Sequence, residues 1–303
     1  MKLIENHNQV VFAKRYLWQV IAIHLVTLGV APFLFTWQAM LFAWVSLSLF
    51  AYSMGIFHHM YLTHDSFKTH KWIEYLGSLF GTLTWRGPFA GPVQYVAMHR
   101  VHHRYSDEEA DPHTPTKGIF YALMGWFWNL PYGFSRYELY ERHATDIAAD
   151  PFHRFLDQHV DGLQLLWAIV CFGFGGSIGE AHGFDLLNGL RFVVYGVFVK
   201  SFLMIYLANL VDVINHTVGY RAYETHDHST NSLLMFVVHL GGAISWHNNH
   251  HAHPSYFTVR KNWWEIDLHY AFLRTLGLFG LVWDIKVMDE YRREHTGAIS
   301  SPA

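Results

Sequence analysis

The sequence predicts an all-α integral membrane protein with four transmembrane helices in two hairpins and a cytoplasmic helical cap. Charged residues make up only 15% of the 303 residues, aromatic residues make up 17%, and the mean hydropathy is +0.10. Long apolar segments occur in two pairs, and nearly all of the 24 histidines lie outside them. This mixture is typical of a membrane part joined to a polar part, which we interpret as one domain over residues 1–303.

The first apolar pair covers residues 16–37 and 38–57, and neither segment contains Asp, Glu, Lys or Arg. Each is about 20 residues long, the length that spans a hydrocarbon core. Pro32 is compatible with a tight connection between them, so the pair predicts a transmembrane hairpin. Residues 1–15 are polar and lack a small-residue cleavage site after them, which argues against a cleaved signal peptide.

The second apolar pair covers residues 163–182 and 190–213, and the cap is expected from residues 58–162 and 214–303. Of the 21 Lys and Arg residues, only Arg191 and Lys200 lie between residues 163 and 213, and none lies between 16 and 57. The positive-inside rule therefore predicts that both termini and the cap are cytoplasmic. The compact length and the lack of a retention signal favour a bacterial inner membrane.

Composition also excludes several classes of function. The net charge is −3, so nothing indicates a nucleic-acid partner. The single cysteine, Cys171, lies in an apolar segment and supports neither a disulfide framework nor a thiolate metal site.

Histidines form three clusters next to apolar segments, in the motifs "HMYLTH", "HRVHH" and "HNNHH". Positions i, i+3 and i+4 of a helix share one side, so each H-x-x-H-H motif should point three imidazoles the same way. His59 and His64 are five apart and diverge by roughly 140° on an ideal helix, which suits contact with two adjacent ions. Eight imidazoles exceed what one zinc takes, and they suit iron, copper or zinc, so two metal ions are predicted. Asp212 and His216, in "DVINH", are candidates to join them.

These motifs, in this order around two apolar hairpins, resemble the three histidine boxes of membrane fatty-acid desaturases, and most of all the stearoyl-CoA (delta-9) branch. The resemblance includes the flanking text of "GIFHHMYLTHDSF", "HRVHHRYSDEEADPHTP", "HTVGYRAYET" and "SWHNNHHAHP", and extends from about Tyr52 to Trp283. It implies a di-iron centre with nine histidine ligands. They are His59, His64, His99, His102, His103, His216, His247, His250 and His251.

The resemblance also implies the reaction. Two iron ions, O2 as co-substrate and two external electrons would remove two hydrogens from a fatty acyl chain and leave a cis double bond, as in the delta-9 branch. The acyl group would be carried on CoA, on a carrier protein or in a membrane lipid. The chain has neither a nucleotide-binding glycine motif nor a fused haem domain motif. The electrons are therefore expected from a separate carrier such as ferredoxin, rubredoxin or cytochrome b5.

Asp212 departs from the family pattern, which usually has Asn at this position, supporting the metal through water. Either the carboxylate accepts from the same water, or it binds iron directly or acts as a strong acceptor beside a ligand. The second interpretation could change the outcome of the reaction. It keeps a di-iron hydroxylase or acetylenase acting on acyl or alkyl chains open as an alternative.

Other residues are candidates for substrate contacts or for support of the metal ions. An apolar tunnel could be lined by aromatic residues, with a head-group contact near residues 85–94. The candidates are Tyr52, Trp85, Arg86, Gln94, Trp126, Trp128 and Trp246. Arg100, Arg104, Asp107 and Asp111 are expected around the ligands or simply at the surface, and His113 is not expected to be a ligand.

Lys200 lies inside the fourth apolar segment, where a charge indicates either function or snorkelling to an interface. A four-helix metal-binding or transport protein without oxygen chemistry is the remaining alternative. It would need polar residues along the spans, and only Lys200 and His24 are present there.

Overall fold

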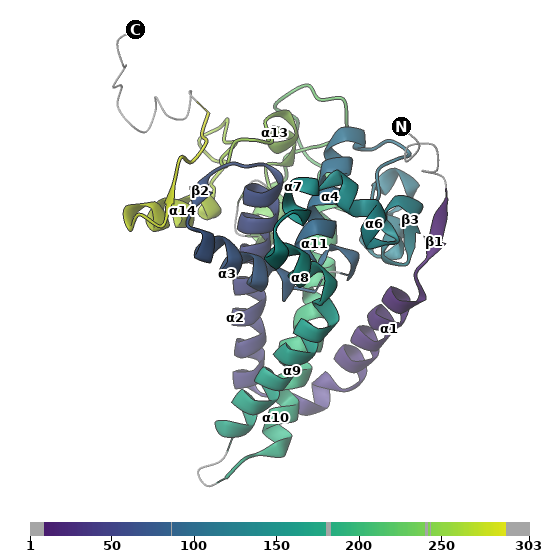
Figure 1. Ribbon diagram of the computed structural model, residues 1–303, viewed down its shortest axis with the longest axis vertical. Coiled ribbons are helices and arrows are strands. Elements are labelled where there is room, and N and C mark those ends of the chain that lie inside the picture. The colour runs from purple at the N-terminus through teal and green to yellow at the C-terminus, as the bar shows by residue number, and fades with distance from the viewer. Residues whose placement is uncertain (1–8, 86, 180–182, 240–241, 243, 289–303) are drawn as a thin grey trace.

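Three helices of the computed structural model, which describes residues 9–85, 87–179, 183–239, 242 and 244–288, are long and apolar enough to cross a membrane. The first joins α2 (Trp37–Ser53) to the π-helix η2 (Met54–Thr63), and the second is α9 (Val160–Ser177). The third joins α10 (Leu186–Val193), the π-helix η8 (Val194–Val199) and α11 (Lys200–Asn215). Figure 1 shows them gathered in one bundle.

The expected first span is a shorter helix than the sequence pattern suggested. Helix α1 (Lys14–Gly29) has 16 residues, and a 3-10 helix, η1 (Ala31–Leu34), follows it with Pro32 in its first turn. At 1.5 Å per residue α1 is about 24 Å long, less than the roughly 30 Å of a hydrocarbon core. Thr36 then caps α2 by accepting a hydrogen bond from the backbone N–H of Ala39. The turn therefore falls within residues 30–36, before the predicted boundary.

The remaining elements gather at one end of the long helices, and we call this part the head (Figure 1). Two small antiparallel sheets pair β1 (Val10–Phe12) with β3 (Asn129–Pro131), and β2 (Lys68–Thr69) with β4 (Val282–Trp283). The principal helices of the head are α3 (Lys71–Thr82), α4 (Pro92–Tyr105), α8 (Pro151–Gln158), α12 (Leu233–His239), α13 (His247–Ala252) and α14 (Leu268–Leu278). The short helices are η3 (Gly87–Phe89), η4 (Pro115–Lys117), α5 (Ile119–Leu123), η5 (Gly125–Phe127), η6 (Tyr132–Phe134), α6 (Tyr137–Tyr140), η7 (Glu141–His143) and α7 (Thr145–Ala148).

Helix α4 is the central element of the head, because most of its side chains are buried. It begins with Pro92, a residue suited to the first turn because that turn needs no backbone donor. The carboxylate of Asp157, on α8, accepts a hydrogen bond from the backbone N–H of Gln94 at 2.9 Å. The fixed start of α4 determines where its three histidines lie.

The π-helix η2 packs against α3 at two glycines. A Cβ atom at Gly77 would collide with the ring of Phe57, and one at Gly81 would lie 2.8 Å from His58 Nε2. The absence of side chains at these two positions therefore lets the widened turn of η2 approach α3 closely. This contact positions the end of the first long helix, where His59 and His64 lie.

Candidate metal centre

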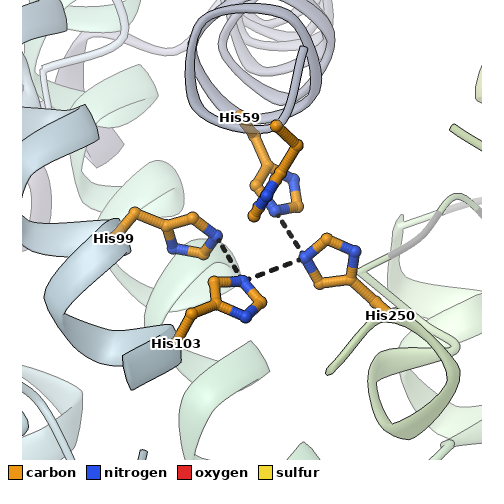
Figure 2. Close-up of side chains that lie close together, drawn as sticks. His59, His99, His103 and His250 are labelled. Carbon is orange, nitrogen blue, oxygen red and sulfur yellow. Dashed lines mark hydrogen bonds between the residues drawn. The ribbon is translucent and has the colours of Figure 1, made fainter. Parts of the chain in front are cut away.

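The structure brings the nine predicted histidines together in two groups. The ligand nitrogens within each group lie within 4.8 Å of one another. The five-histidine group contains His59, His64, His99, His103 and His250, and Figure 2 shows four of these rings facing one another. The four-histidine group contains His102, His216, His247 and His251.

Each H-x-x-H-H helix contributes to both groups. Helix α4 places His99 and His103 in the five-histidine group and turns His102 into the other. Helix α13 does the reverse, because His247 and His251 join the four-histidine group. Adjacent residues differ by about 100° around a helix, whereas residues four apart nearly coincide. The expectation that all three imidazoles of a motif point the same way was therefore wrong.

The pair His59 and His64 also differs from the expectation, because both residues belong to the five-histidine group. The 140° divergence assumed an α-helix, but Met54–Thr63 is a π-helix and His64 caps it. A π-helix closes its hydrogen bonds between residues five apart, which places such residues above one another. The two rings lie 5.0 Å apart between centroids, so the pair serves one group and not two adjacent ions.

The nitrogen positions fit transition-metal ions. His250 Nε2 lies 3.0 Å from His59 Nε2 and 3.1 Å from His103 Nε2, so several ring nitrogens converge on one point. A neutral imidazole carries one N–H, and such a cluster cannot satisfy all its members by mutual hydrogen bonds. His64, His102 and His251 each have a buried Nε2 without a hydrogen-bond partner. Metal ligation would satisfy these atoms.

Burial keeps most of these imidazoles in the neutral form that binds metals. Burial first, and the neighbouring histidines second, hold the pKa values of His99, His103 and His250 well below the usual value. Neutral imidazole is the ligating form, so no proton has to be removed from these three side chains when an ion binds at neutral pH.

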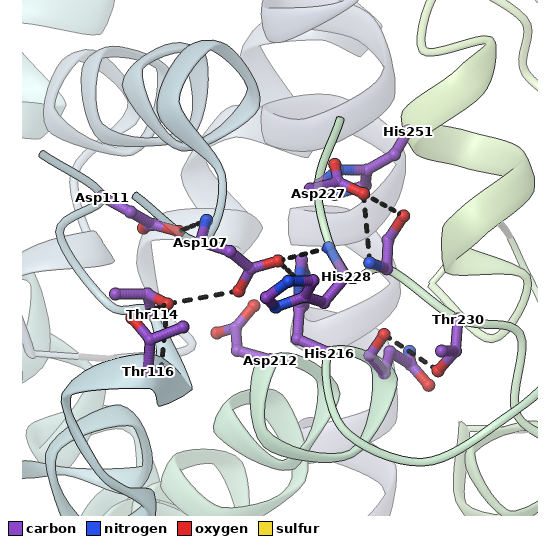
Figure 3. A network of polar contacts seen from close by, with 12 residues as sticks. Asp107, Asp111, Thr114, Thr116, Asp212, His216, Asp227, His228, Thr230 and His251 are labelled. Atoms are coloured by element: carbon purple, nitrogen blue, oxygen red, sulfur yellow. Dashed lines mark hydrogen bonds and ion pairs between the residues drawn. The ribbon is translucent and has the colours of Figure 1, made fainter. Parts of the chain in front are cut away.

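Three carboxylates accept hydrogen bonds from the outer nitrogens of the four-histidine group, and Figure 3 shows two of these pairs, Asp107 with His216 and Asp227 with His251. Asp111 lies 3.0 Å from His102 Nδ1, and Asp107 lies 2.8 Å from His216 Nδ1. Asp227 lies 2.5 Å from His251 Nδ1. Such carboxylates fix the tautomer and orientation of a ligand and raise its basicity. Sequence reasoning missed Asp227, although it stands between two histidines in "HDH" and could have been included on that ground.

The carboxylates are ionised despite their burial. Burial alone would raise the pKa of Asp227, but hydrogen bonds from Ser229 and Thr225 lower it to about 2. Burial would likewise lower the pKa of His102, but the charge of Asp111 outweighs it and raises that pKa to about 9. Three negatively charged carboxylates therefore surround the four-histidine group.

Asp212 lies beside this group but contacts a different histidine. Its Oδ2 atom is 3.5 Å from Nδ1 of His113, and the His113 ring is 4.5 Å from that of His102. His102, Asp111 and His113 form a further set with metal-ligand spacing, so His113 is closer to the site than its sequence position indicated. Asp212 and His113 both line the cavity described next.

An apolar cavity leads to both histidine groups from between α2 and α11. Its wall contains Trp44, Leu47 and Tyr52 of α2, Met204 and Val211 of α11, and the histidines His59, His99 and His247. Of the aromatic residues expected along a tunnel, Tyr52 lines this cavity. A chain of methylene groups fits such a wall, because apolar surface binds apolar ligands.

The other candidates for substrate contact lie elsewhere. Trp85, Trp126 and Trp246 are buried in the hydrophobic core, and Trp128 packs against it. Gln94 donates to the backbone oxygen of Phe134. These side chains are used in packing and hydrogen bonding within the head, so this cavity gives their expected substrate contacts no support. Arg86 lies outside the described residues.

The remaining cationic candidates have structural contacts. Arg100 forms a two-pronged salt bridge with Asp146, at 2.7 and 2.8 Å, whereas Arg104 is at the surface beside Tyr105. Lys200 does not snorkel to an interface: it is fully buried and donates to the backbone oxygen of Leu83, at the end of α3. It thereby ties the third long helix to the head.

Comparison with known proteins decides the family. A model of the family described as fatty acid desaturase matches residues 35–283. The chain belongs to the fatty acid desaturase family. The desaturase is 34% identical over 263 residues to a protein named sn-1 stearoyl-lipid 9-desaturase from Anabaena variabilis, which covers 86% of this chain and 88% of the relative. Family membership excludes the alternative of a transport protein.

Two further relatives have names that state different acyl carriers, a lipid in one and CoA in the other. The desaturase is 31% identical to delta-9 acyl-lipid desaturase 2 of Arabidopsis thaliana, over 89% of this chain and 81% of that protein. It is 32% identical to acyl-CoA 5-desaturase AL21 of Anemone leveillei, over 89% and 78% respectively. Similarity over this length therefore does not by itself choose between carriers.

Proposed function

We propose that this desaturase introduces a cis double bond, delta-9-like, into a fatty acyl chain in an O2-dependent reaction at two iron ions, one in each histidine group. One observation carries the proposal: two groups of buried imidazoles stand side by side along the wall of an apolar cavity. An unactivated methylene has no acidic proton, so side-chain acids and bases cannot remove its hydrogens. When bound, iron supplies the redox chemistry with dioxygen that side chains lack.

In this proposal the side chains of the protein hold the metal ions, orient the ligands and exclude water from the substrate. The nine histidines would hold the ions. Asp107, Asp111 and Asp227 would keep three of these histidines in orientation by accepting hydrogen bonds from their Nδ1 atoms. Leu47, Met204 and Val211 would hold the acyl chain against the histidine groups and keep water away from the reacting carbons. Position along this wall would decide which carbons react.

The proposal includes a substrate carrier, an electron donor and a location. Relatives named as acyl-lipid and acyl-CoA desaturases support a fatty acyl chain as the substrate, carried in a membrane lipid or on CoA. Two electrons would come from a separate carrier such as ferredoxin, rubredoxin or cytochrome b5. We place the protein in a bacterial inner membrane with four spans, α1 being the first, and with the head and both termini in the cytoplasm.

The test is product analysis with metal analysis. Cells that express the chain should contain acyl groups lighter by two hydrogens, and the purified protein should hold two iron ions per chain. His102→Ala should lose both the product and one or more ions. His159→Gln is the control, because His159 is exposed and its ring contacts only Phe155 of the preceding helix in the contacts described. Acyl groups that gain oxygen would contradict desaturation and favour a hydroxylase.

Asp212 separates the proposal from its hydroxylase and acetylenase alternatives. If the carboxylate acts on the metal ions, directly or as a strong acceptor, Asp212→Asn should change the product ratio and the iron spectrum. Product ratio by mass spectrometry and Mössbauer parameters of iron-loaded protein are the measurements. An unchanged product, rate and spectrum would show that the negative charge of Asp212 has no effect on the metal ions, because the neutral amide of Asn then does the same.

A further inference from the structure

The segment from Trp263 to Phe279 exposes several large apolar side chains that lie close together along the chain. Trp263 is 82% exposed, Leu278 81% and Phe279 74%, and Ile266 and Phe272 are about half exposed. Single exposed apolar residues are ordinary, but a contiguous patch of them marks an interaction surface. Helix α14 has only one charged residue, Arg274, so most of its outer face is poorly suited to water.

The position of α14 identifies what covers this surface. Helix α14 packs against the first long helix where α2 becomes η2: the His269 ring lies 4.3 Å from that of Tyr52, and a Cβ atom at Gly55 would lie 3.6 Å from it. Figure 1 shows α14 lying across the direction of α2 and projecting away from the bundle. The patch therefore lies at the depth where the long apolar helix enters the head.

The apolar surface continues beyond α14. Strands β2 and β4 join the end of α14 to the start of α3, where Trp72 and Leu76 are exposed. Two helices that flank the exit of one membrane-length helix thus expose tryptophan and aliphatic side chains. Tryptophan is enriched at this level of a bilayer because its ring is apolar and its N–H is polar.

A groove of about 430 Å³ beside α14 is lined by two arginines, Arg260 and Arg274. Arg274 is exposed and its guanidinium lies 5.9 Å from the centre of the Tyr270 ring, and Arg260 donates to the backbone oxygen of Trp263. The wall also includes Asp267, whose pKa burial raises to about 6 and whose Oδ1 atom accepts from the Tyr270 N–H. The described lining residues include two arginines and one acidic residue, Asp267, which is buried and interacts with Arg260, so the groove carries a net positive charge.

We propose that Trp263–Phe279 is an interfacial anchor lying in the headgroup layer of the bilayer, and that Arg260 and Arg274 bind the phosphodiester of a membrane phospholipid in this groove. Helix α14, with 11 residues, is too short to span a membrane but long enough to lie in its surface. A guanidinium presents paired donors that match phosphate oxygens. The site is separate from the histidine groups and independent of the metal ions.

The depth of the segment can be measured in nanodiscs. Phe279→Cys carries a fluorophore at the proposed anchor, and Glu109→Cys carries it at an exposed position in the loop after α4. The native Cys171 is fully buried, and unlabelled wild type measures its background. Lipids brominated near the headgroup should quench the label at 279 several-fold more than the label at 109. Equal quenching at the two positions would overturn the proposed orientation.

The phosphate site has its own test, on purified holoprotein with phosphatidylglycerol as the probe. Lipid phosphorus retained per chain should fall about tenfold when Arg260→Gln and Arg274→Gln are combined, and should be unchanged in Arg136→Gln, an exposed arginine elsewhere on the head. Retention equal to wild type in the double variant would overturn the site. Displacement of the lipid by millimolar inorganic phosphate would overturn phospholipid as the occupant, and binding of a soluble protein there would favour a docking surface instead.

Discussion

Asp157 is a buried carboxylate outside the histidine groups that holds the start of α4. Its Oδ1 atom accepts from the Gln94 backbone N–H at 2.9 Å, and its Oδ2 atom accepts from the Tyr140 hydroxyl at 2.5 Å. Gly91 leaves room for it, because a Cβ atom there would collide with Oδ1. Burial outweighs these hydrogen bonds and raises the pKa of Asp157 to about 6.

Replacing Asp157 should change how stability depends on pH. The pKa of this carboxyl is raised on folding from about 4 to about 6, so its favourable contribution is present below pH 4 and is lost as the pH rises through 6. Asp157→Asn keeps an acceptor and an amide donor but does not ionise. Relative to wild type, the variant should gain up to about 3 kcal/mol between pH 4 and pH 7. Thermal unfolding of both proteins at several pH values measures this, and parallel curves would contradict it.

Some residues of the site were predictable from the sequence and others were not. The nine histidines could be found because they stand in short motifs with fixed spacing. Asp157 could not, since its partner Gln94 is 63 residues away and only the fold brings them together. Trp246 misled the prediction because a tryptophan next to a histidine motif can point into the core, where its N–H donates to the backbone oxygen of Ile266.

Among the elements, η2 depends on its contact with α3. Gly77→Ala should force the Phe57 ring to move and should destabilise the protein by about 1–3 kcal/mol, as overpacking does. Because η2 carries His59, the same change should lower the iron content. Thermal unfolding and metal analysis are the measurements.

Gly173→Ala is the matched control for this substitution. Gly173 is also within a helix, but a Cβ atom there meets nothing within 4 Å. Helix propensity alone should then stabilise the control by up to about 1 kcal/mol. Equal effects of the two substitutions would show that the contact between α3 and η2 does not position the histidines.

The prediction of elements failed where the helix changed its period. The apolar length of residues 38–57 correctly indicated a long helix, but it could not show that the helix continues to Thr63 as a π-helix. A π-helix needs tertiary packing to hold its widened turn, here against the glycines of α3, and that packing is absent from local sequence patterns. The relation between His59 and His64 was therefore predicted for the wrong geometry.

At the scale of the molecule, the nine histidines tie together elements far apart in the sequence. They come from η2 and its cap, from α4, from the end of α11 and from α13. Removing the metal ions with a chelator should therefore lower the unfolding temperature by about 10 °C, since a ligand bound only by the folded state stabilises it. Calorimetry before and after chelation measures the shift, and refilling with iron should reverse it. An unchanged temperature would mean that the histidine groups hold themselves in place.

The general architecture was accessible from the sequence, but its proportions were not. Apolar segments of about 20 residues predicted helices of membrane length, and three such helices are present in the part of the chain that the structure describes. Helix α1 is shorter because the chain turns within residues 30–36. The way α14 lies across α2 could not be foreseen, since "LHYAFLRTLGL" reads equally well as a buried helix.

Helices α4 and α13 each contribute histidines to both groups, and this has a consequence for the binding of the two metal ions. An ion bound by either group immobilises both of these helices. The second ion then binds to helices that are already ordered, so its binding costs less conformational entropy. Filling should consequently be cooperative, with empty and doubly filled chains in a substoichiometric titration and few half-filled ones.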